Sequence, residues 1–287
     1  MQTVKAGDVT LGWRAWGEGD ITVLFVHGNL ASKDWIELAA PLFPRGLRVI
    51  GVDWRGCGDS ERPPPTADYA NYSMQQHAQD MIAALDALRI GRCHLATHST
   101  GGIISTRMLL LQPERFGRVL ALDPVSPLGM AFEEAHFAAF RAMRDSLDVT
   151  RAMMAVAAAS LFTPESLAPG AAPRIRDSGD ERAALFERIV QQTFTVGDGI
   201  WLGTPYQLNE EHKRRELAPL MPTIQNEHLV LWGEQDVIIP QADLRAMAAA
   251  MPHCRLVTIP GIGHSMNLER PALYAGYFGA FFAGQRL

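Results

Sequence analysis

A serine between a predicted strand and a predicted helix is the residue of this chain best suited to chemistry. The apolar run Cys93–Ala96 predicts a strand, and a helical pattern begins at Thr100, directly after Ser99. A chain that turns from strand to helix without a spacer strains the serine backbone and exposes its hydroxyl at the sheet edge. Small residues are needed two positions on either side, where Thr97 and Gly101 stand. Ser99 is therefore a candidate nucleophile, and the plain alternative is a serine that caps a buried helix.

An acid and a histidine follow Ser99 along the chain, each just after a predicted strand. The run Leu229–Trp232 leads to a turn with Asp236, and Arg255–Ile259 leads to His264. The carboxyl ends of parallel strands lie at one edge of a sheet, so residues distant in sequence can meet there. The order serine, acid, histidine differs from that of chymotrypsin-like and subtilisin-like enzymes.

Four further motifs carry a family resemblance. They are His27-Gly28-Asn29; Asp53–Ser60, similar to D-x-R-G-x-G-x-S; Trp232–Asp236 with Pro240, similar to W-G-x-x-D-x-x-x-P; and Gly263-His264 with Glu269 and Pro271, similar to G-H-x-x-x-x-E-x-P. With them the chain resembles the α/β-hydrolase fold superfamily, in its serine-nucleophile branch with a helical cap. Thr97 departs from the glycine of the family's G-x-S-x-G. Haloalkane dehalogenases and epoxide hydrolases of this fold use an aspartate nucleophile, and Ser99 argues against both.

The resemblance implies a role for each candidate catalytic residue. Ser99 would attack, His264 would take its proton, and Asp236 would hold the imidazole tautomer and stabilise the imidazolium. Asp123 is a second candidate acid, because some family members place theirs at the end of the preceding strand. The Trp232–Asp236 motif is the fuller match and favours Asp236.

The resemblance also indicates an oxyanion hole. Its donors would be the backbone N–H of Thr100 and one from the loop after His27-Gly28, either Asn29 or Leu30. His27 is expected to shape this loop rather than act as a base. His98 is a candidate substrate contact beside the nucleophile, with simple packing against the elbow as the alternative.

The predicted elements alternate between strand and helix, which is typical of a mostly parallel, doubly wound sheet. The strand patterns cover Thr3–Ala6, Val9–Trp16, Ile21–Val26, Leu47–Asp53, Arg92–Thr97, Arg118–Asp123, Glu227–Trp232 and Arg255–Ile259. The helical patterns between them cover Ser32–Phe43, Met74–Leu88, Thr100–Leu111, Gln241–Met251 and Pro271–Phe282. The first two strands predict an antiparallel pair, and the sheet would have eight strands.

One long stretch, residues 127–214, breaks the alternation. Its patterns are helical, and such an excursion is too long for a loop. The resemblance places a helical cap here, inserted into a core formed by residues 1–126 and 215–287. Its large apolar residues include Met130, Phe132, Met153, Met154, Phe162, Phe194, Trp201 and Tyr206. We expect most of them to pack within the cap or against the core. Met154 and Trp201 are the candidate substrate contacts among them.

The composition and charge of the chain limit the classes of molecule that it is expected to bind. The chain has 287 residues, 47% of them hydrophobic, and a net charge of −5 without a basic cluster. Nucleic acid and anionic membranes are therefore not expected as partners. Three scattered cysteines and an N-terminus unlike a signal peptide favour the cytoplasm. No cofactor or metal is expected, and the chain would act as a monomer or homodimer on a small molecule.

Together these features predict a serine hydrolase that cleaves a carboxylic ester, a lactone or a thioester with a hydrophobic part. Two classes of alternative stay open. The first is a C–C bond hydrolase or a cofactor-free relative similar to haloperoxidases. The second is a ligand-binding protein without catalytic activity, because some members of the superfamily serve as receptors.

Overall fold

An eight-stranded sheet runs through the centre of the computed structural model, which describes residues 2–168, 170–177 and 179–284. The strands are β1 (Gln2–Ala6), β2 (Val9–Trp16), β3 (Ile21–Val26), β4 (Leu47–Val52), β5 (Cys93–His98), β6 (Phe116–Leu122), β7 (His228–Gly233) and β8 (Cys254–Ile259). Their order across the sheet is β1-β2-β4-β3-β5-β6-β7-β8. The pairs from β4 to β8 are parallel, and β1 and β2 add an antiparallel edge. The predicted eight-stranded, mostly parallel sheet is confirmed.

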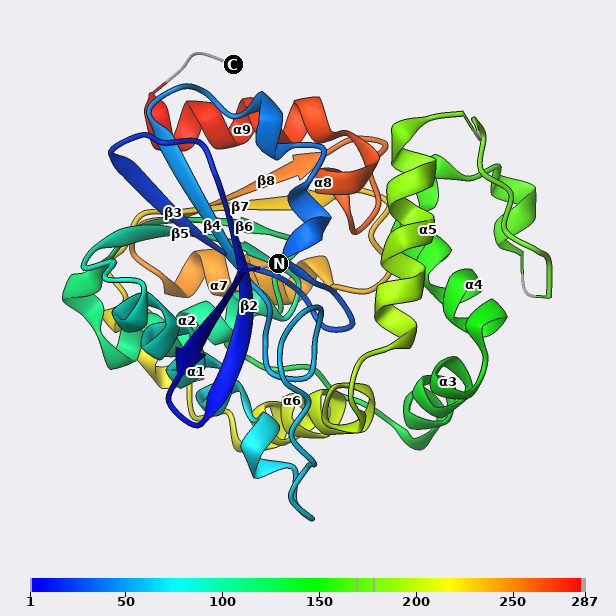
Figure 1. Ribbon diagram of the computed structural model, residues 1–287, viewed down its shortest axis with the longest axis horizontal. Helices are drawn as coiled ribbons and strands as arrows, with labels where there is room; N and C mark the ends of the chain where they lie inside the picture. The colour runs from blue at the N-terminus through cyan, green and yellow to red at the C-terminus, as the bar shows by residue number, and fades with distance from the viewer. Residues whose placement is uncertain (1, 169, 178, 285–287) are drawn as a thin grey trace.

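Helices cover both faces of the sheet, so the central strands are apolar on both sides. On one face α1 (Met74–Ala87), α2 (Gly101–Leu111) and α7 (Gln241–Ala250) bury their apolar stripes in a shared core. On the other face α9 (Pro271–Ala283) packs through its aromatic residues. Figure 1 shows α9 on one side of the strands and α1, α2 and α7 on the other.

A helical segment fills the interval between β6 and β7. It contains α3 (Glu134–Asp145), α4 (Leu147–Ala157), α5 (Glu181–Phe194), a π-helical turn at Gly199–Gly203 and α6 (Thr204–Arg214). Its described part includes one isolated β-bridge and no strand. In Figure 1, α3, α4 and α5 stand beside the sheet rather than on its faces. We call this segment the insertion, and its limits of 127 and 214 stay a prediction.

One expected helix differs from the structure. The stretch predicted as a helix over Ser32–Phe43 forms two short 3-10 helices, Lys33–Ile36 and Ala40–Leu42. Pro41 lies at the start of the second one, and a proline lacks the N–H that a continuous helix would need there. Ser32 caps the first of them, because its hydroxyl accepts from the N–H of Asp34.

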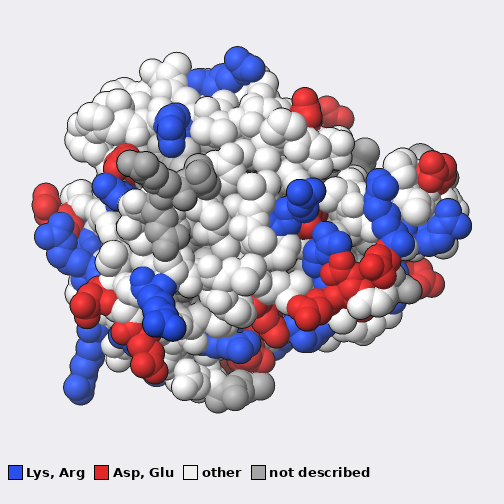
Figure 2. Space-filling model, turned by 90° about the horizontal axis from the view of Figure 1, so that it is seen from above, with Lys and Arg blue, Asp and Glu red and all other residues white. Residues whose placement is uncertain are grey.

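Charged side chains are mixed in sign on the surface. On the face shown in Figure 2, Lys and Arg lie among Asp and Glu with much uncharged surface between them. None of the helices that the structure describes is both long and apolar enough to cross a membrane.

Candidate active site

Ser99 lies in the turn between β5 and α2 with a backbone φ of +53°, a left-handed conformation that a residue with a side chain rarely adopts. Backbone hydrogen bonds hold the turn. The Ser99 N–H donates to the Leu122 carbonyl at 3.0 Å, and the Ser99 carbonyl accepts from Val125 at 2.8 Å. A β-carbon on Gly101 would lie 2.1 Å from the Val26 carbonyl oxygen. This explains why a small residue stands two positions after the serine.

The loop after β3 presses against this turn. A β-carbon on Gly28 would lie 2.8 Å from the Ser99 β-carbon, so only glycine allows the approach. Leu30, two residues on, has a φ of +56°. Asn29, Leu30 and Thr100 all line the same cavity as Ser99. Among the described residues, neither the Leu30 N–H nor the Thr100 N–H donates a hydrogen bond to another protein group.

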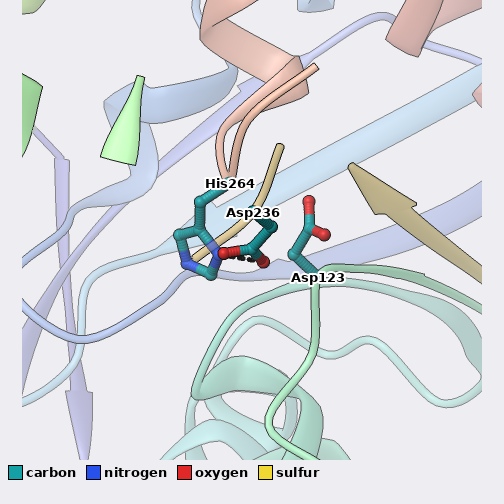
Figure 3. Close-up of side chains that lie close together, drawn as sticks. All are labelled: Asp123, Asp236 and His264. Carbon is teal, nitrogen blue, oxygen red and sulfur yellow. Dashed lines mark hydrogen bonds and ion pairs between the residues drawn. The ribbon is translucent and has the colours of Figure 1, made fainter. Parts of the chain in front are cut away.

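His264 and Asp236 form a buried pair. His264 Nδ1 lies 2.8 Å from Asp236 Oδ2. Figure 3 shows the imidazole and the carboxylate facing each other. Asp236 Oδ1 accepts from the N–H groups of Ile238 at 2.7 Å and Ile239 at 3.2 Å. Burial acts to raise the Asp236 pKa, but the charge of His264 and these hydrogen bonds outweigh it and lower the pKa. The aspartate is thus held ionised toward the imidazole.

Asp123, the second candidate acid, is beside this pair but not part of it. Its Oδ1 accepts from the Gly233 N–H at 2.8 Å, and its Oδ2 is buried without a partner among the described residues. Burial, and next the charge of Asp236, raise its pKa well above the ordinary range. Figure 3 shows the Asp236 carboxylate between His264 and Asp123.

These three residues are also the described group closest to a metal-ligand arrangement. One donor atom from each of Asp123, Asp236 and His264 lies within 4.8 Å of the others. His264 Nδ1 is already bonded to Asp236, and a carboxyl with a raised pKa is a poor ligand because ligands must lose their protons. The donor set fits a hydrogen-bonded acid–histidine pair better than a metal site.

Two further histidines support the site. His27 Nδ1 donates to the Gly28 carbonyl at 2.8 Å while its Nε2 accepts from the Trp54 N–H at 3.1 Å. His98 Nε2 donates to the His264 carbonyl at 2.9 Å. Burial lowers the pKa of both rings to about 3, so both are neutral and unsuited to act as bases near neutral pH. His27 thus joins its loop to Trp54, and His98 joins the end of β5 to the segment of His264.

A cavity of about 550 Å³ brings most of the predicted site residues together. Its lining includes Asn29, Leu30, His98, Ser99, Thr100, Met154 and His264. Trp201 is not in the lining. It is 1% exposed and packs in the core within the π-helical turn, where Tyr69 and Tyr72 approach the flanking glycines.

The cavity lining also contains residues that the sequence analysis did not select as substrate contacts. Four of the eight large apolar residues noted in the insertion line the cavity, namely Met130, Phe132, Met153 and Met154. The lining also includes Phe140, Met143, Val237, Ile238 and Asp243. Val237 and Ile238 directly follow Asp236, and two apolar residues in the turn that carries a predicted catalytic acid are a signal that could have identified them.

Comparison with known proteins places the chain in a family. A family model described as the alpha/beta hydrolase fold matches residues 21–271. The dihydrolipoyllysine-residue acetyltransferase component of the acetoin cleaving system of Pseudomonas putida is 25% identical over 93% of this chain, which spans 65% of that protein. The 2-hydroxymuconate semialdehyde hydrolase of Pseudomonas sp. (strain CF600) is 27% identical over 91% of this chain and 86% of its own length.

A solved structure agrees in fold. Est816, described as an N-acyl homoserine lactone degrading enzyme, superposes with a TM-score of 0.76 at 23% identity, over 98% of this chain and 100% of its own. This likeness shows the fold alone. Since the family model covers most of the sequence, and the sheet order and helices agree with it, the chain belongs to the α/β-hydrolase fold family.

Proposed function

We propose that this protein is a serine hydrolase that cleaves a carboxylic ester, a lactone or a thioester through an acyl-enzyme on Ser99. One observation carries the proposal. The strained Ser99 and the buried His264, which is bonded to Asp236, face one apolar cavity. A serine needs a base for activation, a histidine needs an acid to fix its tautomer, and an acyl group needs a dry pocket.

The reaction would proceed in two halves. The Ser99 oxygen attacks the substrate carbonyl carbon as its proton passes to His264 Nε2, while the Nδ1 proton stays on the hydrogen bond to Asp236. The carbonyl–leaving-group bond then breaks, and the leaving alcohol or thiol takes the proton from His264. Water, deprotonated by His264, next attacks the carbonyl carbon of the acyl-enzyme. The bond to the Ser99 oxygen breaks, His264 returns the proton to that oxygen, and the acid is released. The His98 bond to the His264 carbonyl helps to hold the base in place.

The developing oxyanion would be met by backbone donors. The Thr100 N–H at the start of α2 is one, and the N–H of Asn29 or Leu30 is the other. Each such donor commonly contributes about 3 kcal/mol to transition-state stabilisation. The close approach of Gly28 to Ser99 supports this assignment, because it brings the loop within reach of the reacting carbonyl.

The insertion would act as a cap that selects the acyl part. Its α3 and α4 supply Phe140, Met143 and Met154 to the lining of the cavity that also contains Ser99. No lysine or arginine occurs among the described lining residues, whereas Asp243 does. A carboxylate on the substrate would meet neither lysine nor arginine there, and the described lining groups that could carry a positive charge are histidines, His136 and His212 among them. The substrate we propose is therefore neutral and apolar near the scissile bond.

Active-site labelling tests the proposal. A fluorophosphonate should modify Ser99 in the wild type and fail to do so in His264→Ala, because the hydroxyl then lacks its base. Unlabelled wild-type protein that still binds apolar ligands would instead support the receptor alternative.

A substrate panel separates the enzyme alternatives. Neutral p-nitrophenyl esters of graded chain length should be hydrolysed faster than esters of the same length that end in a carboxylate. Lactones and acyl thioesters complete the panel. Turnover confined to a C–C bond substrate would instead support the C–C bond hydrolase alternative. The expected cytoplasmic location and monomeric or dimeric state stay predictions.

A further inference from the structure

The insertion contacts the loop after β3 through a buried hydrogen bond. The Thr193 hydroxyl, near the end of α5, donates to the Leu30 carbonyl at 2.6 Å. Thr193 is 1% exposed and Leu30 is 6% exposed. The neighbouring Gln192 accepts from the Ser32 hydroxyl at 3.0 Å and donates to Asp34 at 2.7 Å. In Figure 1, α5 lies beside the segment that follows β3. Three hydrogen bonds therefore join the end of α5 to the segment of residues 30–34.

Leu30 needs such support because its backbone is unfavourable on its own. A φ of +56° brings the β-carbon close to the next carbonyl, which disfavours this conformation for any residue except glycine. Threonine hydroxyls in helices often bond to a carbonyl of their own helix, but that of Thr193 bonds to Leu30 instead. The bond stabilises the peptide group that follows Leu30 in one orientation.

The orientation of the Leu30 carbonyl also constrains the direction in which the Leu30 N–H points. In helical conformations of either hand, the N–H and C=O of a residue point in opposite directions along the local axis. With a positive φ and its carbonyl anchored on Thr193, Leu30 would turn its own N–H away from α5. This N–H makes no other hydrogen bond among the described residues, and Leu30 lines the cavity beside Ser99.

We propose that Thr193 is a positioning residue for the oxyanion hole: its hydroxyl holds the loop of residues 28–30 in the conformation that binds the oxyanion. The inference rests on the proposed function, since it concerns the rate of acyl transfer. It gives the insertion a part in the chemistry as well as in substrate selection.

Three variants test the hydroxyl. Thr193→Val removes it at nearly constant volume, and Thr193→Ser keeps it. We expect Thr193→Val to lower kcat about tenfold or more with KM within about twofold, because oxyanion stabilisation acts in the transition state. Thr193→Ser should stay within about threefold of wild-type kcat. Thr195→Val is the matched control, because it makes the same change at an exposed threonine of the same helix end. Among the described residues, the Thr195 hydroxyl bonds only to the Gln192 carbonyl.

A second readout separates positioning from general stability. A trifluoromethyl ketone forms a hemiketal oxyanion on the serine, so its inhibition constant should weaken in Thr193→Val in parallel with kcat. A merely structural role would lower the melting temperature and leave both values in place. If Thr193→Val does not fold, Thr193→Ala is measured in the same way.

Two results would overturn the inference: wild-type kcat in the variants that lack the hydroxyl, or equal losses in Thr193→Val and Thr193→Ser. Failure of the proposed function gives a different result. In that case the fluorophosphonate would not label Ser99 in the wild-type protein, or Ser99→Ala would keep the wild-type activity.

Discussion

The cavity has two walls of opposite character. The wall at the sheet edge carries Ser99, His264 and the loop of Asn29, and hydrogen bonds to backbone groups hold it in place. The wall from the insertion consists largely of apolar side chains such as Met143 and Met154. Hydrogen bonds are directional and can place atoms as precisely as a chemical reaction requires. Apolar packing, in contrast, tolerates substitution by side chains of similar size. The first wall suits the chemistry and the second suits the choice of substrate.

Removing the nucleophile should have the largest effect. Ser99→Ala deletes the attacking oxygen, so hydrolysis should fall below about one percent of the wild-type rate. The melting temperature should stay equal or rise, because the strained turn loses a polar side chain. Purified protein assayed on a p-nitrophenyl ester provides the measurement. Activity above that level in a folded variant would show that the sheet-edge wall does not act through Ser99.

The two acids at neighbouring strand ends come next. Asp236→Asn should lower kcat by about 10³–10⁴-fold with little change in KM, because an amide favours the wrong imidazole tautomer. Asp123→Asn should have a much smaller effect, since Asp123 is bonded to Gly233 rather than to His264. Steady-state kinetics on both variants decide the matter. The reverse ranking would move the acid to the end of β6.

Asp123 should instead affect stability, in a manner that depends on pH. Burial and the charge of Asp236 raise its pKa in the folded state, and Glu269 adds to the same effect. The folded protein therefore keeps a proton that the unfolded chain loses above about pH 4, so the wild type loses stability as pH rises. Asp123→Asn should raise the free energy of unfolding at pH 7 to 8, and the gain should vanish below about pH 4. Urea unfolding at several pH values measures this difference, and a gain that is constant with pH would contradict it.

The sequence predicts the two walls unequally well, for a physical reason. Ser99, Asp236 and His264 each follow a buried strand directly, and strand order then determines where they lie. The insertion offers only helical patterns, which identify an apolar face but not what covers it. Met154 and Trp201 were thus equal candidates, although only Met154 reaches the cavity. The Thr193 bond to Leu30 joins residues 163 positions apart, and nothing in either local pattern indicates it.

The smallest expected effect is a shift in substrate preference from the insertion wall. Met154→Ala removes an apolar side chain from the cavity, so kcat/KM should move several-fold in favour of longer acyl chains. Labelling of Ser99 by a small fluorophosphonate should stay close to the wild-type rate, because the variant leaves the sheet-edge wall intact. Met81→Ala is the matched control, since Met81 is also a buried methionine but belongs to α1 and does not line the cavity. It should lower stability, by roughly 2–5 kcal/mol for a fully buried methionine, without reordering the esters. Equal reordering in both variants would mean that general loosening, rather than the shape of the insertion wall, governs chain-length preference.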